Sequence, residues 1–193
     1  MSIHDLHGKF NGKEFDYISK YLDSEGYSDE KSWAQRFEEE VSKQTGAKYA
    51  VACNSGTSGL HMAMYACGIG HGDEVITPAL TVVMDAYAVI HVGATPVFVD
   101  VERDTYGISV EEIKKKITNK TKAIITVSLQ GLSVDMDPIL ELAKENNIVV
   151  IDDSAQNILG EYKGRVAGTL ADISVLSFEN KKHMTSGSEG GML

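Results

Sequence analysis

The sequence has few cysteines and relatively few basic residues. Its two cysteines, Cys53 and Cys67, show neither the spacing of a metal-binding motif nor a disulfide framework. Asp and Glu, 28 in total, outnumber the 18 Lys and Arg, which gives a formal net charge of −10. A chain this acidic is a poor partner for a nucleic-acid backbone or an anionic membrane surface. We therefore expect no metal site, no nucleic acid and no membrane among its ligands.

Long apolar runs are also missing. No uninterrupted stretch reaches the length of a membrane-spanning helix, and the first residues do not have the pattern of a secretory signal. Together with the low cysteine content, this predicts a cytoplasmic protein. The 193 residues contain no internal repeat or low-complexity segment, and their number suits one domain with a sizeable core.

Short apolar strands alternate with amphipathic helices along most of the chain. Strands that are apolar on both faces predict a three-layer α/β fold, with a mostly parallel central sheet and helices on both faces. We expect helices at 29–46, 57–68, 81–93, 109–117 and 136–147, and strands at 49–53, 73–78, 95–101, 122–128, 148–153 and 172–178.

The two ends of the chain depart from this alternation. Residues 1–14 hold few apolar positions and are expected to form an N-terminal arm, which leaves 15–193 as the large domain. Residues 189–193 have the pattern of the start of another strand, so we expect the sequence to be part of something longer.

The segment NSGTSG, residues 54–59, joins a strand to a helix at the edge where open α/β sheets bind ligands. Glycine lets the backbone approach an anion closely. The N–H groups of Thr57, Ser58 and Gly59 would point outward at a helix N-terminus, which favours phosphate. The alternative is an ordinary helix cap made by Ser55 or Thr57.

Two adjacent acids end the strand at 148–153. The side chains of Asp152 and Asp153 point to opposite faces of the sheet, so at most one of them can contact a ligand. A buried acid requires a cationic or N–H partner. The alternative is that one of the two caps the following turn.

The segment SFENKKHMTSGSEGG, residues 177–191, places two lysines directly after a strand. A lysine held near a phosphate site is a candidate for Schiff-base chemistry, whereas the alternative is a solvated basic turn. A phosphate cradle, an acid and a lysine together meet the needs of pyridoxal phosphate. The cradle anchors its phosphate, the lysine holds its aldehyde, and the acid keeps its pyridine nitrogen protonated.

The sequence resembles the sugar aminotransferase family named for DegT, DnrJ, EryC and StrS, whose members are fold-type I pyridoxal-phosphate enzymes. The resemblance runs from about Trp33 to the last residue, through SGTSGLHMAM, GIGHGDEVITPALT, GATPVFVDV, TKAIITV, DMDPILELA, VVIDDSAQ and SFENKKHMTSGSEGG. It implies an aspartate-aminotransferase-like large domain in a homodimer. It also implies transfer of an amino group, usually from glutamate, to a keto group on a nucleotide-linked sugar. Family members are about twice this length, so we expect their small C-terminal domain to be absent here.

The resemblance also implies site residues. The family motif S-F-x-x-x-K places the Schiff-base lysine at Lys182 and a phosphate-binding hydroxyl at Ser177. Asp153 corresponds to the acid that faces the pyridine nitrogen, and Gln156 to the amide that contacts the ring hydroxyl. Lys182 and Asp153 would be the catalytic pair. The phosphate loop would consist of Gly56, Thr57 and Ser58.

Several positions depart from the family pattern, among them Ser128, where a His is common, and Gln130, where an aromatic side chain often lies. Val82 stands where an aromatic side chain commonly stacks on the cofactor ring, so weaker ring packing is expected. A dehydratase subgroup carries His in place of the lysine, and here His183 directly follows Lys182, while the extra Ser188 lengthens the loop. Besides the transaminase, the open alternatives are a sugar dehydratase, another fold-type I chemistry such as a lyase, and a non-catalytic remnant that binds cofactor or phosphate.

Overall fold

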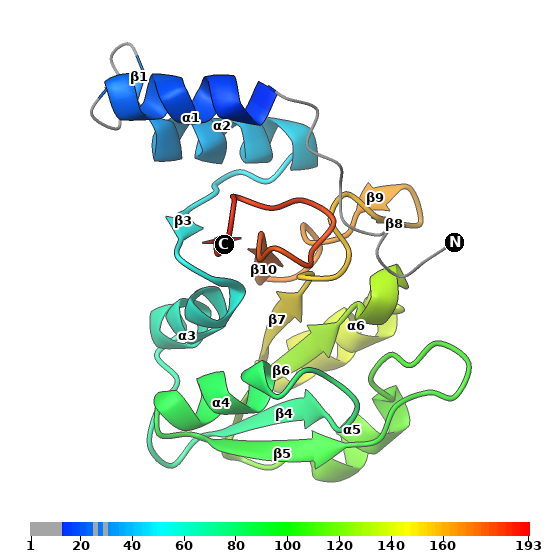
Figure 1. Cartoon of the computed structure of the whole chain (residues 1–193). Helices are drawn as coiled ribbons and strands as arrows, with labels where there is room; N and C mark the ends of the chain where they lie inside the picture. Colours follow the sequence, from blue (N-terminus) through cyan, green and yellow to red (C-terminus); the bar gives the residue numbers. More distant parts are fainter. Residues whose placement is uncertain (1–12, 25–26, 29–30) are drawn as a thin grey trace.

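The computed structural model describes residues 13–24, 27–28 and 31–193, and Figure 1 shows its overall arrangement. Most of the expected N-terminal arm lies outside the described residues, so the arm stays a prediction. From Lys13 the chain forms α1 (Lys13–Asp23), a helix that the sequence analysis did not anticipate. The helical spacing of Phe15, Ile18 and Leu22 is the signal that could have found it.

Helix α1 lies alongside α2 (Trp33–Thr45), and the two are joined through the short antiparallel strands β1 (Tyr27–Ser28) and β2 (Lys31–Ser32) (Figure 1). The Tyr17 and Trp33 rings meet edge to face at 6.1 Å between centroids. Helix α2 begins at a capping box of Ser32 and Gln35 and ends at Gly46, where the sequence predicted its end.

A seven-stranded sheet forms the centre of the molecule. Strand β11 runs antiparallel to both neighbours, whereas the pairs β10–β7, β7–β6, β6–β4 and β4–β5 are parallel. The mostly parallel sheet predicted from the sequence is therefore confirmed. In spatial order its strands are β3 (Ala52–Cys53), β11 (Gly191–Met192), β10 (Ile173–Ser177), β7 (Val149–Asp153), β6 (Thr121–Val127), β4 (Glu74–Pro78) and β5 (Thr95–Val99).

Helices cover both faces of this sheet, which confirms the predicted three layers. Adjacent residues of one strand belong to different cores: Ile125 packs with Met64 of α3, whereas Ile124 packs with Ile139 of α6. Within the part of the chain that the structure describes, no helix has the length and hydrophobicity to cross a membrane. The covering helices are α3 (Gly56–Ala66), α4 (Met84–His91), α5 (Val110–Lys116) and α6 (Met136–Asn146).

One hairpin, β8 (Glu161–Tyr162) with β9 (Arg165–Val166), was not predicted, because two-residue strands carry no periodic signal. Its turn, Lys163-Gly164, has both φ angles positive, at 51° and 76°, as in the two-residue turns of β-hairpins.

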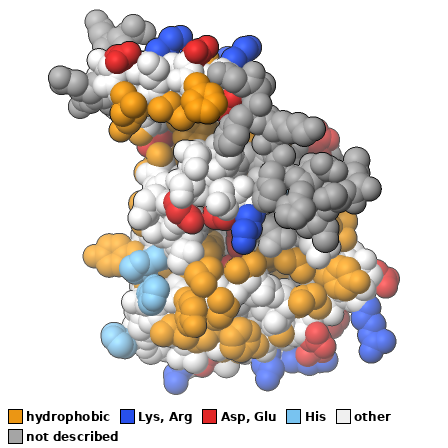
Figure 2. All heavy atoms as spheres, viewed as in Figure 1, with side chains coloured by type: hydrophobic (Ala, Val, Ile, Leu, Met, Phe, Trp, Pro, Cys, Tyr) orange, Lys and Arg blue, Asp and Glu red, His pale blue; other side chains and the backbone are white. Residues whose placement is uncertain are grey.

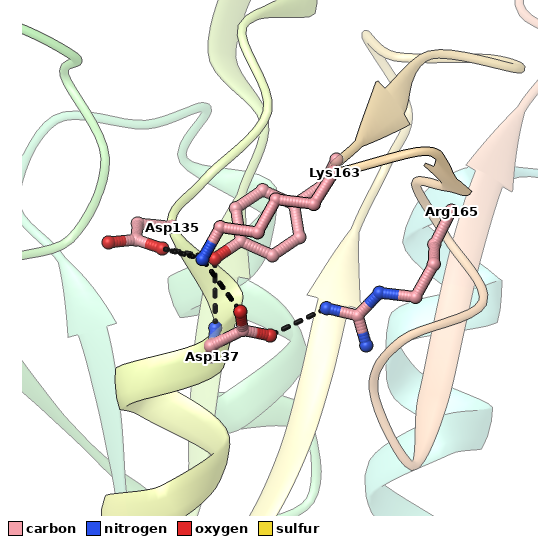
Figure 3. A network of polar contacts seen from close by, with 5 residues as sticks. Asp135, Asp137, Lys163 and Arg165 are labelled. Atoms are coloured by element: carbon pink, nitrogen blue, oxygen red, sulfur yellow. Dashed lines mark hydrogen bonds and ion pairs between the residues drawn. The ribbon is translucent and has the colours of Figure 1, made fainter.

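The hairpin is tied to the N-terminus of α6 by ion pairs (Figure 3). Asp137 contacts Lys163 at 2.7 Å and Arg165 at 2.5 Å, and the Tyr162 hydroxyl donates to Asp135. Hydrogen bonds from Lys163 and Arg165 lower the pKa of Asp137 to about 2, so this carboxyl is ionised at neutral pH. The network holds the hairpin, which follows β7 in the chain, against the start of α6.

The close contact between α3 and β10 gives a test of the packing. A Cβ atom on Gly59 would lie 2.8 Å from Val175 Cγ1, so Gly59→Ala forces the helix and the strand apart. Although alanine favours helices, we expect this overpacking to lower the free energy of unfolding by about 1–3 kcal/mol. Urea unfolding measures the effect.

The matched control is Gly70→Ala, where the nearest atom to an added Cβ, the Val92 carbonyl oxygen, is 3.7 Å away. A change within about 0.5 kcal/mol is expected there. Equal changes in the free energy of unfolding at Gly59 and Gly70 would contradict the conclusion that close packing of α3 on β10 excludes a side chain at Gly59.

Candidate active site

A cleft of about 270 Å³ opens where β7 and β10 end, beside the N-terminus of α3. Six of the seven predicted site residues line it: Gly56, Thr57, Asp153, Gln156, Ser177 and Lys182. The seventh, Ser58, is not among the lining residues. The rest of the lining consists of Ser55, Leu60, Val82, Met84, Ala155, Glu179 and Glu189. The fold therefore brings segments from four distant parts of the chain to one place.

Of the neighbouring residues 181–183, only Lys182 lines the cleft. The Asn180 N–H donates to the Ser188 carbonyl at 2.9 Å, so the extra residue of the loop is taken up in a backbone bond. The charge of Lys182 lowers the pKa of Asp153, which places the ammonium group within electrostatic reach of that carboxyl. The loop thus presents Lys182, and not Lys181 or His183, to the acid.

The first turn of α3 forms one wall of the cleft. Ser55 is the N-cap, and its hydroxyl oxygen accepts from the Ser58 N–H at 3.1 Å. The Ser58 hydroxyl, 3.1 Å from that of Ser55, belongs to this cap. The N–H groups of Gly56 and Thr57 have no acceptor within the helix, because the first turn of a helix leaves its donors unpaired. The expected cap is therefore present, and the same terminus leaves two N–H donors that an anion could use.

Gly56 allows this terminus to touch the end of β10. A Cβ atom there would lie 3.0 Å from Ser177 Cβ and 3.3 Å from its Oγ. Ser177 is buried, and it also lines the cleft. A hydroxyl and the N–H groups of a helix terminus thus lie side by side, an arrangement that binds phosphate groups.

The two acids of β7 have separate environments, as their alternation predicted. Asp153 lines the cleft, and its Oδ1 accepts from the Ala155 N–H at 2.9 Å. Asp152 is buried, and it accepts from the hydroxyls of Thr126 at 2.7 Å and Ser154 at 2.6 Å. Burial raises the pKa of Asp153 to about 6 although the Ala155 N–H and the Lys182 charge oppose it. Only Asp153 can contact a ligand.

The Gln156 side chain is held by the backbone of Gln130, which has a strained conformation. The Gln130 N–H donates to Gln156 Oε1 at 2.8 Å, and Gln130 has a φ of 53°, in the left-handed region. With its oxygen engaged, the amide nitrogen of Gln156 is the group that can donate to a ligand.

The side chains at the expected ring-stacking wall are aliphatic. Val82 lines the cleft together with Met84, which leaves the wall without an aromatic ring. The expectation of weaker ring packing stays a prediction.

Sequence reasoning missed one buried acid, Asp85 of α4, and two acids of the lining, Glu179 and Glu189. Asp85 interacts with Asp153. A single acid within the apolar helical segment TVVMDAYAVIHVG was the available signal. Among the described residues, no group of three or more His, Cys, Asp or Glu is arranged to hold a metal ion.

Comparison with known proteins confirms the family that the sequence resembles. The model of the DegT/DnrJ/EryC1/StrS aminotransferase family matches residues 9–193. GDP-perosamine synthase from Escherichia coli O157:H7 is 46% identical over 182 residues, which cover 94% of this chain and 50% of that protein. The chain spans about half the length of the curated relatives it matches.

Two solved structures are similar over nearly the whole chain. The aminotransferase from Psychrobacter cryohalolentis has a TM-score of 0.92 and 40% sequence identity, and the match covers 96% of this chain and 47% of that protein's chain. NtdA from Bacillus subtilis with bound cofactor PMP has a TM-score of 0.89 and 29% sequence identity, and the match covers 99% of this chain and 43% of that protein's chain.

The raised pKa of Asp153 gives a prediction for stability. A carboxyl whose pKa is near 3.9 in the unfolded chain and about 6 in the folded one binds its proton more tightly when folded. Its contribution to the free energy of unfolding therefore decreases as pH rises from about 4 to about 6. We expect Asp153→Asn to gain stability relative to the wild type across that interval, as measured by urea unfolding from pH 4 to pH 8.

Asp137→Asn is the control with the opposite sign. The pKa of Asp137 is lowered to about 2, so its ion pairs stabilise the fold at neutral pH and are lost as pH falls through about 2. This variant is expected to be less stable than the wild type from pH 5 to pH 8. An Asp153→Asn protein that is also less stable at pH 8 would show that burial of the Asp153 charge carries no cost.

Proposed function

Because the chain belongs to the DegT/DnrJ/EryC1/StrS aminotransferase family, we propose that the cleft binds pyridoxal phosphate and that the protein transfers an amino group to a sugar. The observation that supports this most directly is the shared cleft, in which the Lys182 amine, the Asp153 carboxylate and the N-terminus of α3 meet. Each of these groups suits a different part of that cofactor. PMP, the cofactor in the NtdA structure, is its amine form.

The residues present fit the cofactor. Its phosphate would be held by the N–H groups of Gly56 and Thr57 and by the Ser177 hydroxyl, where a side chain on Gly56 would obstruct the approach. Asp153 would accept from the protonated ring nitrogen, and the Gln156 amide would donate to the ring hydroxyl. When bound, the cofactor supplies an electron sink for a carbanion formed next to nitrogen.

Two side chains would carry the proton chemistry. Lys182 would hold the cofactor through its aldehyde, and its amine, once released, would move the proton at the Cα atom of the amino donor. Asp153, with a pKa of about 6, is mostly ionised at pH 7 and would hold the proton on the ring nitrogen. The position of Lys182 in the cleft favours amino transfer over the dehydration that a histidine at this place would indicate.

We propose glutamate as the donor and a keto group on a nucleotide-linked sugar as the acceptor. The family resemblance supports glutamate as the donor. The E. coli relative is named for a GDP-linked sugar, and this name supports the proposed acceptor. Binding of cofactor without turnover is a second candidate function.

We also propose a homodimer. Exposed apolar side chains from α3, from α4 and from Val83, which directly precedes α4, gather on one surface together with His side chains and are here called the α3–α4 patch (Figure 2). Val82 and Met84 of the cleft lie next to it in the chain, so a partner bound there would lie beside the site. The patch consists of Met62, Tyr65, Val83, Tyr87 and Ile90. Apolar surface gathered in this way is typical of an interaction site.

Covalent trapping tests the cofactor assignment. The chain is incubated with pyridoxal phosphate and treated with borohydride, and the modified residue is located by peptide mass. We expect the label on Lys182 in the wild type and no label in Lys182→Ala, because a methyl group offers no amine to the aldehyde. Lys181→Ala is the matched control and should be labelled like the wild type. Label on Lys181 instead would refute the assignment.

Turnover separates the two candidate functions. Formation of 2-oxoglutarate from glutamate in the presence of a keto nucleotide-sugar would support the transaminase. A trapped cofactor on Lys182 without any 2-oxoglutarate would support a chain that binds cofactor only.

The proposed dimer predicts an effect of charge in the α3–α4 patch. Ile90→Asp is expected to weaken self-association at least tenfold, because a buried unpaired carboxylate is costly. Sedimentation equilibrium measures it. Leu132→Asp, which replaces a residue of similar exposure outside the patch, should leave association unchanged. A wild-type chain that is monomeric at all concentrations would contradict the proposal.

A further inference from the structure

Asp85 is a buried acid with an incomplete set of hydrogen bonds. Its side chain is 0% exposed, and it projects from α4, an otherwise largely apolar helix. The Thr81 hydroxyl donates to Oδ2. No described residue forms a hydrogen bond with Oδ1, which is one of two such buried side-chain atoms in that part of the chain. An ionised carboxylate with an unsatisfied oxygen is strongly disfavoured in a protein interior.

A second acid, Asp153, interacts with the Asp85 carboxyl. The carboxyls of Asp85 and Asp153 are close enough for a hydrogen bond between them to influence both pKa values, and the charge of Asp152 acts on both as well. Burial, followed by the charge of Asp153, raises the pKa of Asp85 well above its usual range. Two buried carboxyls in contact do not both ionise, so the pair shares one proton.

The surroundings decide which acid holds that proton. Asp153 accepts from the Ala155 N–H and is influenced by the Lys182 ammonium group, and both favour its ionised form. Asp85 receives one hydroxyl, that of Thr81, and it is the more deeply buried of the two. A proton on Asp85 Oδ1 gives that oxygen the partner it lacks. The remaining charged groups at the cleft are Glu179 and Glu189, which are acids on its rim.

We propose that Asp85 is a protonated carboxylic acid at neutral pH, that its Oδ1 donates to the Asp153 carboxylate, and that it thereby acts as a positioning residue for Asp153. The pair then presents a single negative charge to the cleft, which matches one protonated ring nitrogen. The identity of that ring rests on the proposed function, whereas the shared proton is a property of the chain alone. Asp85 itself does not line the cleft.

The first measurement needs no cofactor. Aspartate labelled with ¹³C at the carboxyl carbon is incorporated into the whole chain, and the carboxyl signals are followed by NMR from pH 5 to pH 9. We expect at least one carboxyl that is still protonated at pH 7 in the wild type and in Asp152→Asn. Its signal should be missing in Asp85→Asn. Aspartates that are all ionised at pH 7 would overturn the proposal.

The second measurement compares two variants in their affinity for pyridoxal phosphate between pH 5 and pH 8. Asparagine is a neutral isostere of protonated aspartic acid, and its amide can still accept from Thr81 and donate to Asp153, so Asp85→Asn should bind within about twofold of the wild type. Asp85→Ala removes the donor. Below pH 6 it should bind about tenfold more weakly, since Asp153 then retains its proton to higher pH.

The outcomes separate this proposal from the proposed function. If Asp85 were ionised, Asp85→Asn would remove a negative charge beside Asp153 and change the affinity tenfold or more, which would overturn the proposal. Equal affinity of Asp85→Ala and the wild type at every pH would also overturn it. Should the wild type bind no pyridoxal phosphate, the proposed function fails, and the NMR signal still decides whether the proton is shared. The asparagine variant keeps the test valid if the alanine variant does not fold.

Discussion

The close approach of the first two turns of α3 to the end of β10 is the contact on which the site depends. Gly56 faces Ser177 and Gly59 faces Val175, and at both positions a Cβ atom would come within 3.0 Å or less of the strand's side chains. This contact places the unpaired N–H groups of a helix terminus next to a strand-end hydroxyl. The chain that leaves β10 then carries Lys182 to the same cleft within a few residues. Close packing of α3 against β10 is therefore enough to explain why both positions are glycine, although they lie at the site.

Three buried acids at one end of the sheet show how the fold manages negative charge. Asp152 is satisfied by two hydroxyls and stays inside the protein. Asp153 combines one N–H group with a nearby ammonium group and stays open to a ligand. Asp85 has one hydroxyl and an oxygen that needs a proton. The pKa values of all three are raised by burial, so the site is maintained at a cost in stability at neutral pH.

The fold was largely predictable from the sequence, because alternating apolar strands and amphipathic helices leave few arrangements that cover a parallel sheet. Lys182 could be chosen over Lys181 only through the family motif, since both follow the same strand. The β8–β9 hairpin and the pairing of Asp85 with Asp153 were not predictable. Two-residue strands have no period, and the interaction of Asp85 with Asp153 joins residues 68 positions apart, which no local spacing encodes. The place of Ser58 in the phosphate loop stays a prediction, and its hydroxyl accepts from that of Ser55 in the helix cap.

The aliphatic wall of the cleft and the α4 part of the α3–α4 patch belong to one continuous segment of chain. Val82 and Met84 line the cleft, whereas Val83, between them, is 52% exposed on the patch. Asp85, the next residue, reaches inward to Asp153. Four consecutive residues, 82–85, therefore contribute to the cleft wall, to the α3–α4 patch and to the buried acid beside Asp153. At the start of α4 Val83 offers no side-chain cap, and the Thr81 hydroxyl instead bonds to Asp85, so the bond that begins the helix also holds the buried acid.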